Sequence, residues 1–177
     1  VRALHDLART SEQHPFLLVA SFTHPHDPYV TRSEYWDRYA DVDIPLPEVR
    51  ASDVDDDPHS ARLRAACAAD RSVITDDDIR RARRAYLGNI SYVDDWTHRL
   101  LDTLSALGLA DDTVVILLAD HGDMLGERDL WYKMNFFEGA SRIPLVIHAP
   151  QRFAARRIAA PVSAIWDNCV DLSSTGA

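Results

Sequence analysis

Three short polar clusters hold the residue types that could do chemistry, and the first is Asp120-His121-Gly122-Asp123. It directly follows the apolar run Thr113–Ala119. A carboxylate and an imidazole at the end of a strand can both turn toward one divalent cation when a glycine permits a sharp turn. A strand-to-loop turn without a metal could have the same sequence. The position after an unbroken apolar run favours Asp120 and His121 as metal ligands.

The second cluster is Thr23-His24-Pro25-His26-Asp27-Pro28, which follows an earlier apolar run. Pro25 and Pro28 restrict the backbone on both sides of His26. An imidazole held in this way can donate a hydrogen bond to an anionic oxygen or act as a general acid toward a leaving group. A histidine that only caps its own turn would fit the same residues, and both interpretations stay open.

The third candidate is Lys133, the single lysine in a chain that has 19 Lys and Arg residues. Lysine carries a compact point charge and can shift its pKa, which arginine cannot do. Its ammonium could complete an anion site beside a metal by balancing charge that builds on oxygen during group transfer. Chance retention of one lysine in an arginine-rich chain is the alternative.

Three apolar runs must position these clusters, and we expect them to form buried strands. They are Phe16–Phe22, Thr113–Ala119 and Ile143–His148. Continuous apolar residues, rather than alternating ones, indicate strands that are covered on both faces, as in a parallel sheet. Ligands gather outside the carboxyl ends of the strands in an open α/β sheet, and the first two clusters would lie there.

A long amphipathic helix is expected between the first two strands, from about Asp76 to Leu107. Its apolar residues recur largely at three- and four-residue steps. Thr75 before three aspartates is typical of a helix start, and Gly108 is a plausible stop. A strand, a helical crossover and another strand predict an α/β fold with a mostly parallel central sheet flanked by helices.

Residues 40–58 are rich in proline and aspartate, and we expect an irregular acidic loop there. The run Asp55–Asp57 lacks both the alternating ligand spacing and the turn glycine of a calcium loop. Solvated acids are therefore expected at this run rather than a metal site.

Composition narrows the classes of protein and partner. The 177 residues suit one domain, with 46% hydrophobic and 27% charged residues as in ordinary globular proteins. The net charge of −9 without a basic patch argues against nucleic acid, and no apolar run reaches the ~18 residues needed to cross a membrane. Two cysteines indicate neither a disulfide framework nor a zinc site, so a cytoplasmic location is the default. Homo-oligomerisation is left open.

The motifs taken together resemble the C-terminal half of a sulfatase catalytic domain, over roughly residues 10–165. Pro25-His26-Asp27-Pro28 is similar to the family's Pro-His-x-Pro element. Among sulfatases, the residues around this element and around Lys133 are most similar to those of choline sulfatases. The other matching segments are residues 119–127, 131–133, 138–139 and 142–144. The resemblance implies an alkaline phosphatase-like fold and a sulfuric ester hydrolase. Its substrate would be choline sulfate or a related small anionic sulfate ester.

The resemblance also implies roles for individual residues. Asp120 and His121 would bind a divalent cation, usually calcium in sulfatases. Many sulfatases have asparagine where His121 stands, and histidine at this position is also typical of phosphonate and phosphodiester hydrolases of the same superfamily. This departure leaves manganese or magnesium open as the metal. Lys133 would contact the sulfate oxygens, including the bridging one. His26 would bind the sulfate or protonate the departing alcohol, and His24 is a second candidate for substrate binding.

The nucleophile of sulfatases is a formylglycine made within a Cys/Ser-x-Pro-x-Arg motif, and neither Cys67 nor Cys169 lies in such a motif. We therefore interpret residues 1–177 as a partial sulfatase domain, incomplete at its N-terminal side, with a disordered or divergent tail at 166–177. Little or no turnover is expected from this chain alone. A catalytically inactive sulfatase-like module is the rival from another class of protein.

Overall fold

The computed structural model describes residues 1–9, 14–55, 57–67 and 73–159. The predicted tail at 166–177 and Cys169 lie outside these residues. The helices and strands, in chain order, are α1 (Arg2–Ala8), α2 (Ser33–Asp37), η1 (Ala51–Asp53), α3 (Pro58–Ala66), α4 (Asp76–Ala106), η3 (Ala110–Asp112), β1 (Val115–Leu118), η4 (Glu127–Asp129), α5 (Glu138–Ser141) and β2 (Leu145–His148).

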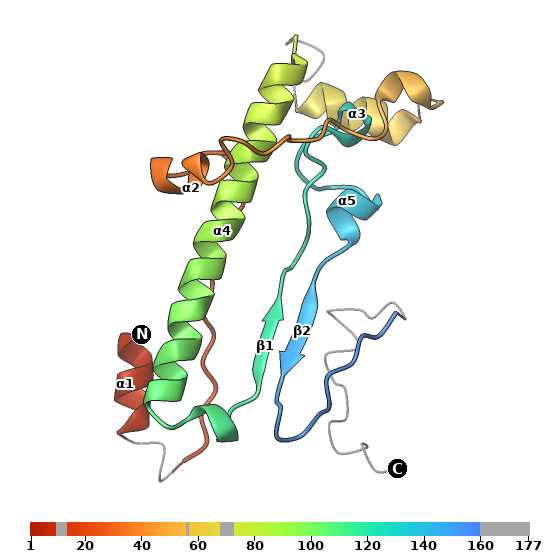
Figure 1. Ribbon diagram of the computed structural model, residues 1–177. Coiled ribbons are helices and arrows are strands. Elements are labelled where there is room, and N and C mark those ends of the chain that lie inside the picture. The colour runs from red at the N-terminus through yellow and green to blue at the C-terminus, as the bar shows by residue number, and fades with distance from the viewer. Residues whose placement is uncertain (10–13, 56, 68–72, 160–177) are drawn as a thin grey trace.

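The long helix α4 extends along most of the length of the chain's fold (Figure 1). Its start is set by a capping box: the Thr75 hydroxyl accepts from the Asp78 N–H at 3.2 Å, and the Asp78 carboxylate accepts from the Thr75 N–H at 3.0 Å. It ends before Gly108, whose φ is +70°. The prediction of this helix from Asp76 to about Leu107 is confirmed.

Two of the three predicted strands form, and they pair antiparallel. Val115 lies opposite His148, and Leu118 lies opposite Leu145. The described residues therefore hold a two-stranded antiparallel sheet beside helices, and the mostly parallel sheet expected from the sequence is not seen among them. Apolar continuity is a poor guide to strand direction, because direction depends on which strand lies alongside.

The prediction of a strand at Phe16–Phe22 is wrong for this structure. The segment is extended and runs in the same direction as β1, but it forms no ladder (Figure 1). Leu17 is 91% exposed. An apolar run becomes a strand only when a neighbouring strand accepts and donates its backbone hydrogen bonds, and the described residues offer none here.

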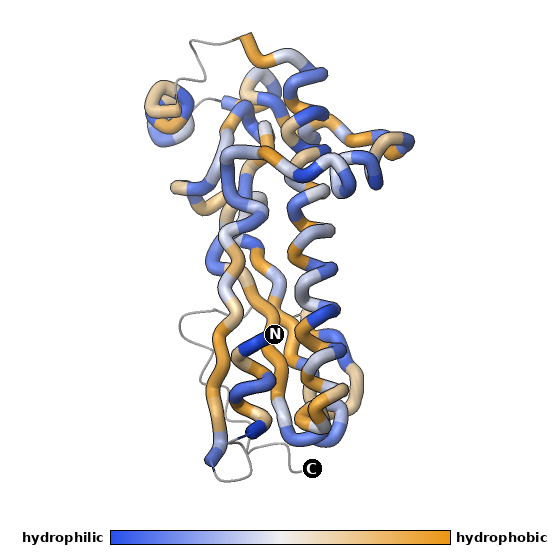
Figure 2. The backbone as a smooth tube through the Cα atoms, turned by 90° about the vertical axis from the view of Figure 1, so that its left-hand side faces the viewer, coloured by the Kyte–Doolittle hydropathy of each residue, from blue (hydrophilic) through white to orange (hydrophobic). Residues whose placement is uncertain are grey.

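The apolar residues of β1 and β2 are also not covered on both faces, contrary to expectation. Ile116, Leu118 and Val146 each keep roughly half of their surface exposed. Figure 2 shows the hydrophobic stretches of the lower strands running next to one another. The core instead includes a tight cluster near the loop after β1, made of Met124, Leu130 and Ala140 with Leu63 and Phe137 packed against it.

The acidic loop at residues 40–58 contains the short helix η1 and leads into α3. Asp57 caps α3, because its carboxylate accepts from the N–H groups of His59 and Ser60 at 3.0 and 2.9 Å. These bonds lower the pKa of Asp57, with the Ser60 hydroxyl making the largest contribution. None of the helices in the described ranges has the length and apolar character needed to cross a bilayer.

Candidate functional site

Three of the residues singled out in the sequence meet at one place. The Lys133 Nζ forms a hydrogen bond with the His26 Nε2. The ring of His121 lies edge-on to the ring of His26, with 6.1 Å between the ring centroids. Residues that are up to 107 positions apart in the chain thus form one cluster, next to the C-terminal end of β1.

The imidazole of His26 is oriented by its neighbour Asp27. His26 Nδ1 lies 2.9 Å from the Asp27 carbonyl oxygen and 2.9 Å from the Asp27 Oδ1. Both partners can only accept a hydrogen bond, so we assign the proton to Nδ1. The Nε2 lone pair then faces Lys133 and accepts from its ammonium group. A turn fixes the backbone here, because the His26 N–H donates to the Thr23 carbonyl at 3.1 Å.

Asp120 and His121 offer two donor atoms suited to a divalent cation. The His121 Nδ1 lies 2.7 Å from the Gly122 carbonyl oxygen, which fixes the ring tautomer and leaves the Nε2 lone pair free. That Nε2 lies 3.7 Å from the Asp120 Oδ2, and the Asp120 side chain is 89% exposed. An imidazole nitrogen beside an open carboxylate is a donor pair that fits such an ion.

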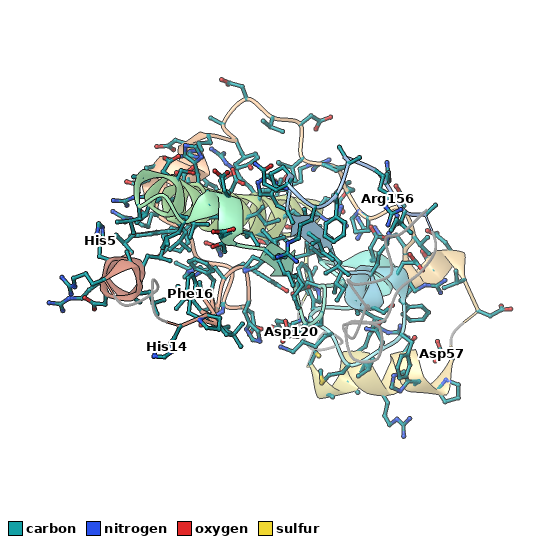
Figure 3. The ribbon with its side chains drawn as sticks, turned by 90° about the horizontal axis from the view of Figure 1, so that it is seen from below. His5, His14, Phe16, Asp57, Asp120 and Arg156 are labelled. Carbon is teal, nitrogen blue, oxygen red and sulfur yellow. The ribbon has the colours of Figure 1, made fainter. Side chains whose placement is uncertain are left out.

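These two residues would be only part of a metal shell. Within the described ranges, no group of three or more His, Cys, Asp or Glu side chains is placed to hold a metal. Asp57, at the end of the acidic run, lies well apart from Asp120 in the view from below (Figure 3). The acidic loop therefore supplies no further ligand from Asp57.

A close backbone approach holds the loop that carries Asp120 and His121. The Gly122 N–H donates to the Ala140 carbonyl at 2.7 Å. A Cβ at Gly122 would stand 2.1 Å from the Gly139 carbonyl oxygen. Only glycine allows the two chains to come this close, so the loop after β1 is fixed against α5.

Asp123 joins the loops of the site, and sequence reasoning assigned it no role. Its carboxylate accepts from the Tyr29 hydroxyl at 2.9 and 3.0 Å, from the Leu125 N–H at 3.0 Å and from the Tyr132 N–H at 3.1 Å. Burial raises the pKa of Asp123 despite these hydrogen bonds. Burial and the nearby Asp123 carboxylate also raise the pKa of Tyr29.

Arg83 and Glu127 fasten the same region to α4 and to the acidic loop. The Arg83 guanidinium donates to the carbonyls of Leu125 and Pro45 at 2.9 and 2.8 Å and to the Glu127 carboxylate at 2.9 Å. Glu127 in turn accepts from the Val49 N–H at 3.1 Å. Burial raises the pKa of Glu127, but these donors outweigh it and hold the pKa below its usual range.

The ring contact of His24 is made with α4. Its ring packs on Tyr92 of α4, with 4.9 Å between the centroids. Tyr92 also contacts the rings of Tyr35 and Trp96 at 5.6 and 6.3 Å. This aromatic packing explains the position of His24, and its role in substrate binding stays a prediction.

The aromatic residues near Lys133 are dispersed. Trp131 and Tyr132 pack on the ring of Tyr29 at 5.9 and 6.2 Å. Phe137 lies under the Arg128 guanidinium. Phe136 is 97% exposed. These four aromatic rings therefore do not form one aromatic cluster beside Lys133 in this structure.

Comparisons with known proteins show which family this chain belongs to. A family model described as Sulfatase matches residues 2–175. The chain is 48% identical over 151 residues to the choline-sulfatase of Rhizobium meliloti (strain 1021), which covers 83% of this chain and 30% of that protein. The chain thus spans about 30% of the length of this relative.

Solved structures share the fold. The structure of yidJ from Bacteroides fragilis superposes with a TM-score of 0.66 and 25% identity, covering 88% of this chain and 30% of that one. The phosphonate monoester hydrolase SpPMH from Silicibacter pomeroyi has a TM-score of 0.56 and 32% identity, covering 71% and 27%. Since the family match extends over nearly the whole chain, the protein belongs to the sulfatase family.

Proposed function

We propose that this chain is the part of a sulfuric ester hydrolase that holds the sulfate group and the leaving-group oxygen. The observation that carries the proposal is the contact between Lys133 and His26 with His121 alongside. Two cationic or hydrogen-bonding side chains that face one point suit the tetrahedral oxygens of a sulfate ester.

Lys133 and His26 have different tasks in this proposal. The ammonium of Lys133 donates to His26 in the free protein and turns to the sulfate oxygens when the ester binds. His26 takes up a proton from solvent at Nε2 and, as an imidazolium, donates that N–H to the ester oxygen. When the bond between sulfur and this oxygen breaks, the proton passes to the departing alcohol and His26 returns to its neutral form. Asp27 keeps the Nδ1 proton in place during this step, because its oxygens lie 2.9 Å from that nitrogen.

Asp120 and His121 would hold a divalent cation in the proposed site, with calcium as our first choice and manganese or magnesium as alternatives. A cation bound there would offset negative charge on the sulfate oxygens. The two side chains lie on a loop that Gly122 and Asp123 fix, so their donor atoms need little reorganisation.

We propose choline sulfate, or a related small sulfate ester, as the substrate. The support is the 48% identity to a choline-sulfatase over most of this chain. We also propose a mostly parallel central sheet for the whole catalytic domain, to which β1 and β2 would contribute. A cytoplasmic location and any homo-oligomer stay predictions.

A phosphonate monoester or phosphodiester hydrolase of the same superfamily is the second candidate. Two observations favour it: histidine at position 121, and the 32% identity to SpPMH. Both candidates use the same anion-binding groups, so rates decide between them. Choline sulfate, an aryl sulfate and an aryl phosphodiester should be compared as substrates of a protein that contains this chain and a nucleophile segment. Faster phosphodiester cleavage would overturn the sulfatase assignment.

Turnover by this chain alone is expected to be negligible, because neither cysteine lies in a formylglycine motif. The same assay on this chain, and on a version extended toward its N-terminus, tests this. Equal rates for the two would contradict our view of the nucleophile. If neither this chain nor the extended version turns over substrate or binds inorganic sulfate, the chain is a non-catalytic module.

A further inference from the structure

Asp123 and its hydrogen-bond partners Tyr29 and Tyr132 each lie within three positions of one group of the proposed anion site. Asp123 follows His121 by two positions, and its partner Tyr132 directly precedes Lys133. Its other partner, Tyr29, follows His26 by three positions. One half-buried carboxylate is therefore hydrogen-bonded to both of the other segments that carry the site.

Several of the hydrogen bonds that join these segments meet at this one carboxylate. Asp123 Oδ1 alone accepts three hydrogen bonds, from the Tyr29 hydroxyl, the Leu125 N–H and the Tyr132 N–H. The Met124 N–H donates to the Tyr132 carbonyl at 2.8 Å. The Asp123 carboxylate accepts from the N–H of the same tyrosine, so both backbone groups of Tyr132 are bonded to this loop. The Tyr132 backbone has a φ of +66°, a left-handed conformation that a tyrosine rarely adopts. The bond to Asp123 helps to hold the chain in that form just before Lys133.

We propose that Asp123, with the hydroxyl of Tyr29, is a positioning residue that sets His26, His121 and Lys133 in register for the sulfate oxygens. It touches neither the substrate nor a metal in this proposal and acts through the loops it joins. The proposal rests on the proposed function for its purpose, but the coupling between Tyr29 and Lys133 can be measured in the ligand-free protein.

The test variant is Tyr29→Phe, which removes the donor and keeps the ring that packs on Trp131 and Tyr132. Its matched control is Tyr39→Phe. This control variant also removes one partly buried hydrogen bond, the 2.7 Å bond between the hydroxyls of Tyr39 and Ser91 of α4. Both variants therefore lose one hydrogen bond, and only one of the bonds reaches the site.

Because Lys133 is the only lysine, a protein labelled with ¹⁵N-lysine gives a single side-chain signal by NMR. We expect Tyr29→Phe to shift this signal and to weaken its contact with the His26 ring, while Tyr39→Phe leaves both unchanged. The dissociation constant for inorganic sulfate should rise about three- to tenfold in Tyr29→Phe only, as for loss of one hydrogen bond. Thermal unfolding should shift by similar amounts in the two variants.

An unchanged Lys133 signal in a folded Tyr29→Phe protein would overturn the proposal, because Asp123 would then only stabilise the fold. Asp123→Asn gives a second measurement. It removes the carboxylate charge that all three donors share, so it should displace the Lys133 signal at least as far as Tyr29→Phe does, and the two changes together should displace it by less than their sum. Failure of the wild-type chain to bind sulfate would count against the proposed function. The Lys133 signal would still decide whether Asp123 positions the loop.

Discussion

The Gly122 N–H and the Ala140 carbonyl are joined at 2.7 Å, and this bond brings the Gly122 Cα against the carbonyl of Gly139. The loop after β1 and the start of α5 are therefore held backbone to backbone. A Cβ at Gly122 would have to displace one of these segments, whereas a Cβ at Gly139 would stand 3.2 Å from the Met124 sulfur and 3.3 Å from the Asp123 carbonyl oxygen. This backbone contact therefore helps to fix the position of the proposed metal ligands Asp120 and His121.

Gly122→Ala should destabilise the fold by about 2 kcal/mol or more, because a Cβ would meet a backbone oxygen that cannot rotate away. Urea unfolding followed by circular dichroism measures the change. Gly108→Ala is the control: its φ is +70° with nothing within 4 Å of a Cβ, so it should cost only the left-handed strain of about 1 kcal/mol. Equal losses would show that the loop moves without penalty.

Lys133→Ala should weaken the binding of inorganic sulfate about tenfold or more, because one charge-assisted hydrogen bond is lost. Lys133→Arg should restore affinity only in part, since the planar guanidinium cannot take the place of a compact ammonium against His26. Isothermal titration calorimetry measures both variants. Arg142→Ala removes an exposed cation that pairs with Glu138 on α5, and sulfate affinity should not change. Loss of affinity in this control would mean that net charge alone attracts the anion.

Asp120→Asn should abolish calcium binding by this chain, which is expected to be weak, with a dissociation constant of about 10⁻⁴ to 10⁻³ M or higher. The reason is that two donor side chains offset little of the cost of dehydrating the ion. Calcium titrations followed through the imidazole signals of His121 give the measurement. Asp111→Asn, at the opposite end of β1, serves as the control. Calcium affinity that survives in Asp120→Asn would exclude this pair as the metal site.

Glu127 predicts a dependence of stability on pH. Its folded-state pKa is held below the usual value, so its contribution is present above the ordinary glutamate pKa of about 4.3 and is lost as the pH falls through the folded value. The free energy of unfolding should therefore fall less steeply between about pH 5 and 3 in Glu127→Gln than in the wild type. Glu138→Gln changes an exposed carboxylate and should keep the wild-type slope. A steeper slope in Glu127→Gln would reverse the sign of the argument.

The helix α4 could be predicted from the sequence because its signals are local. Thr75 and Asp78 form the cap within one turn, and Gly108 supplies the left-handed residue at the other end. Strand pairing is different, because it depends on residues far apart in the chain. The run Phe16–Phe22 has the composition of a strand, yet it needs a neighbour that its own residues cannot specify.

The residues that form the candidate site could be predicted from the sequence, but the residues that hold them in position could not. His26, His121 and Lys133 stand out by residue type and surroundings, and the structure brings them together. Asp123 belongs to the Asp-His-Gly-Asp motif, but its partner Tyr29 lies 94 positions away, so no spacing rule connects them. The one local signal for a supporting role is that Asp123 is a carboxylate two residues after a proposed metal ligand.

The uneven packing of the chain has a consequence for its local unfolding. Loops usually exchange their amide hydrogens before strands do. Here the loop between β1 and β2 surrounds the cluster of Met124, Leu130 and Ala140, whereas the strands keep much of their apolar surface in contact with water. Deuterium uptake should therefore be slower at Met124 and Leu130 than at Ile116 and Ile147. Local unfolding of this chain would therefore begin at the sheet of β1 and β2 and reach the loop that carries the candidate site last.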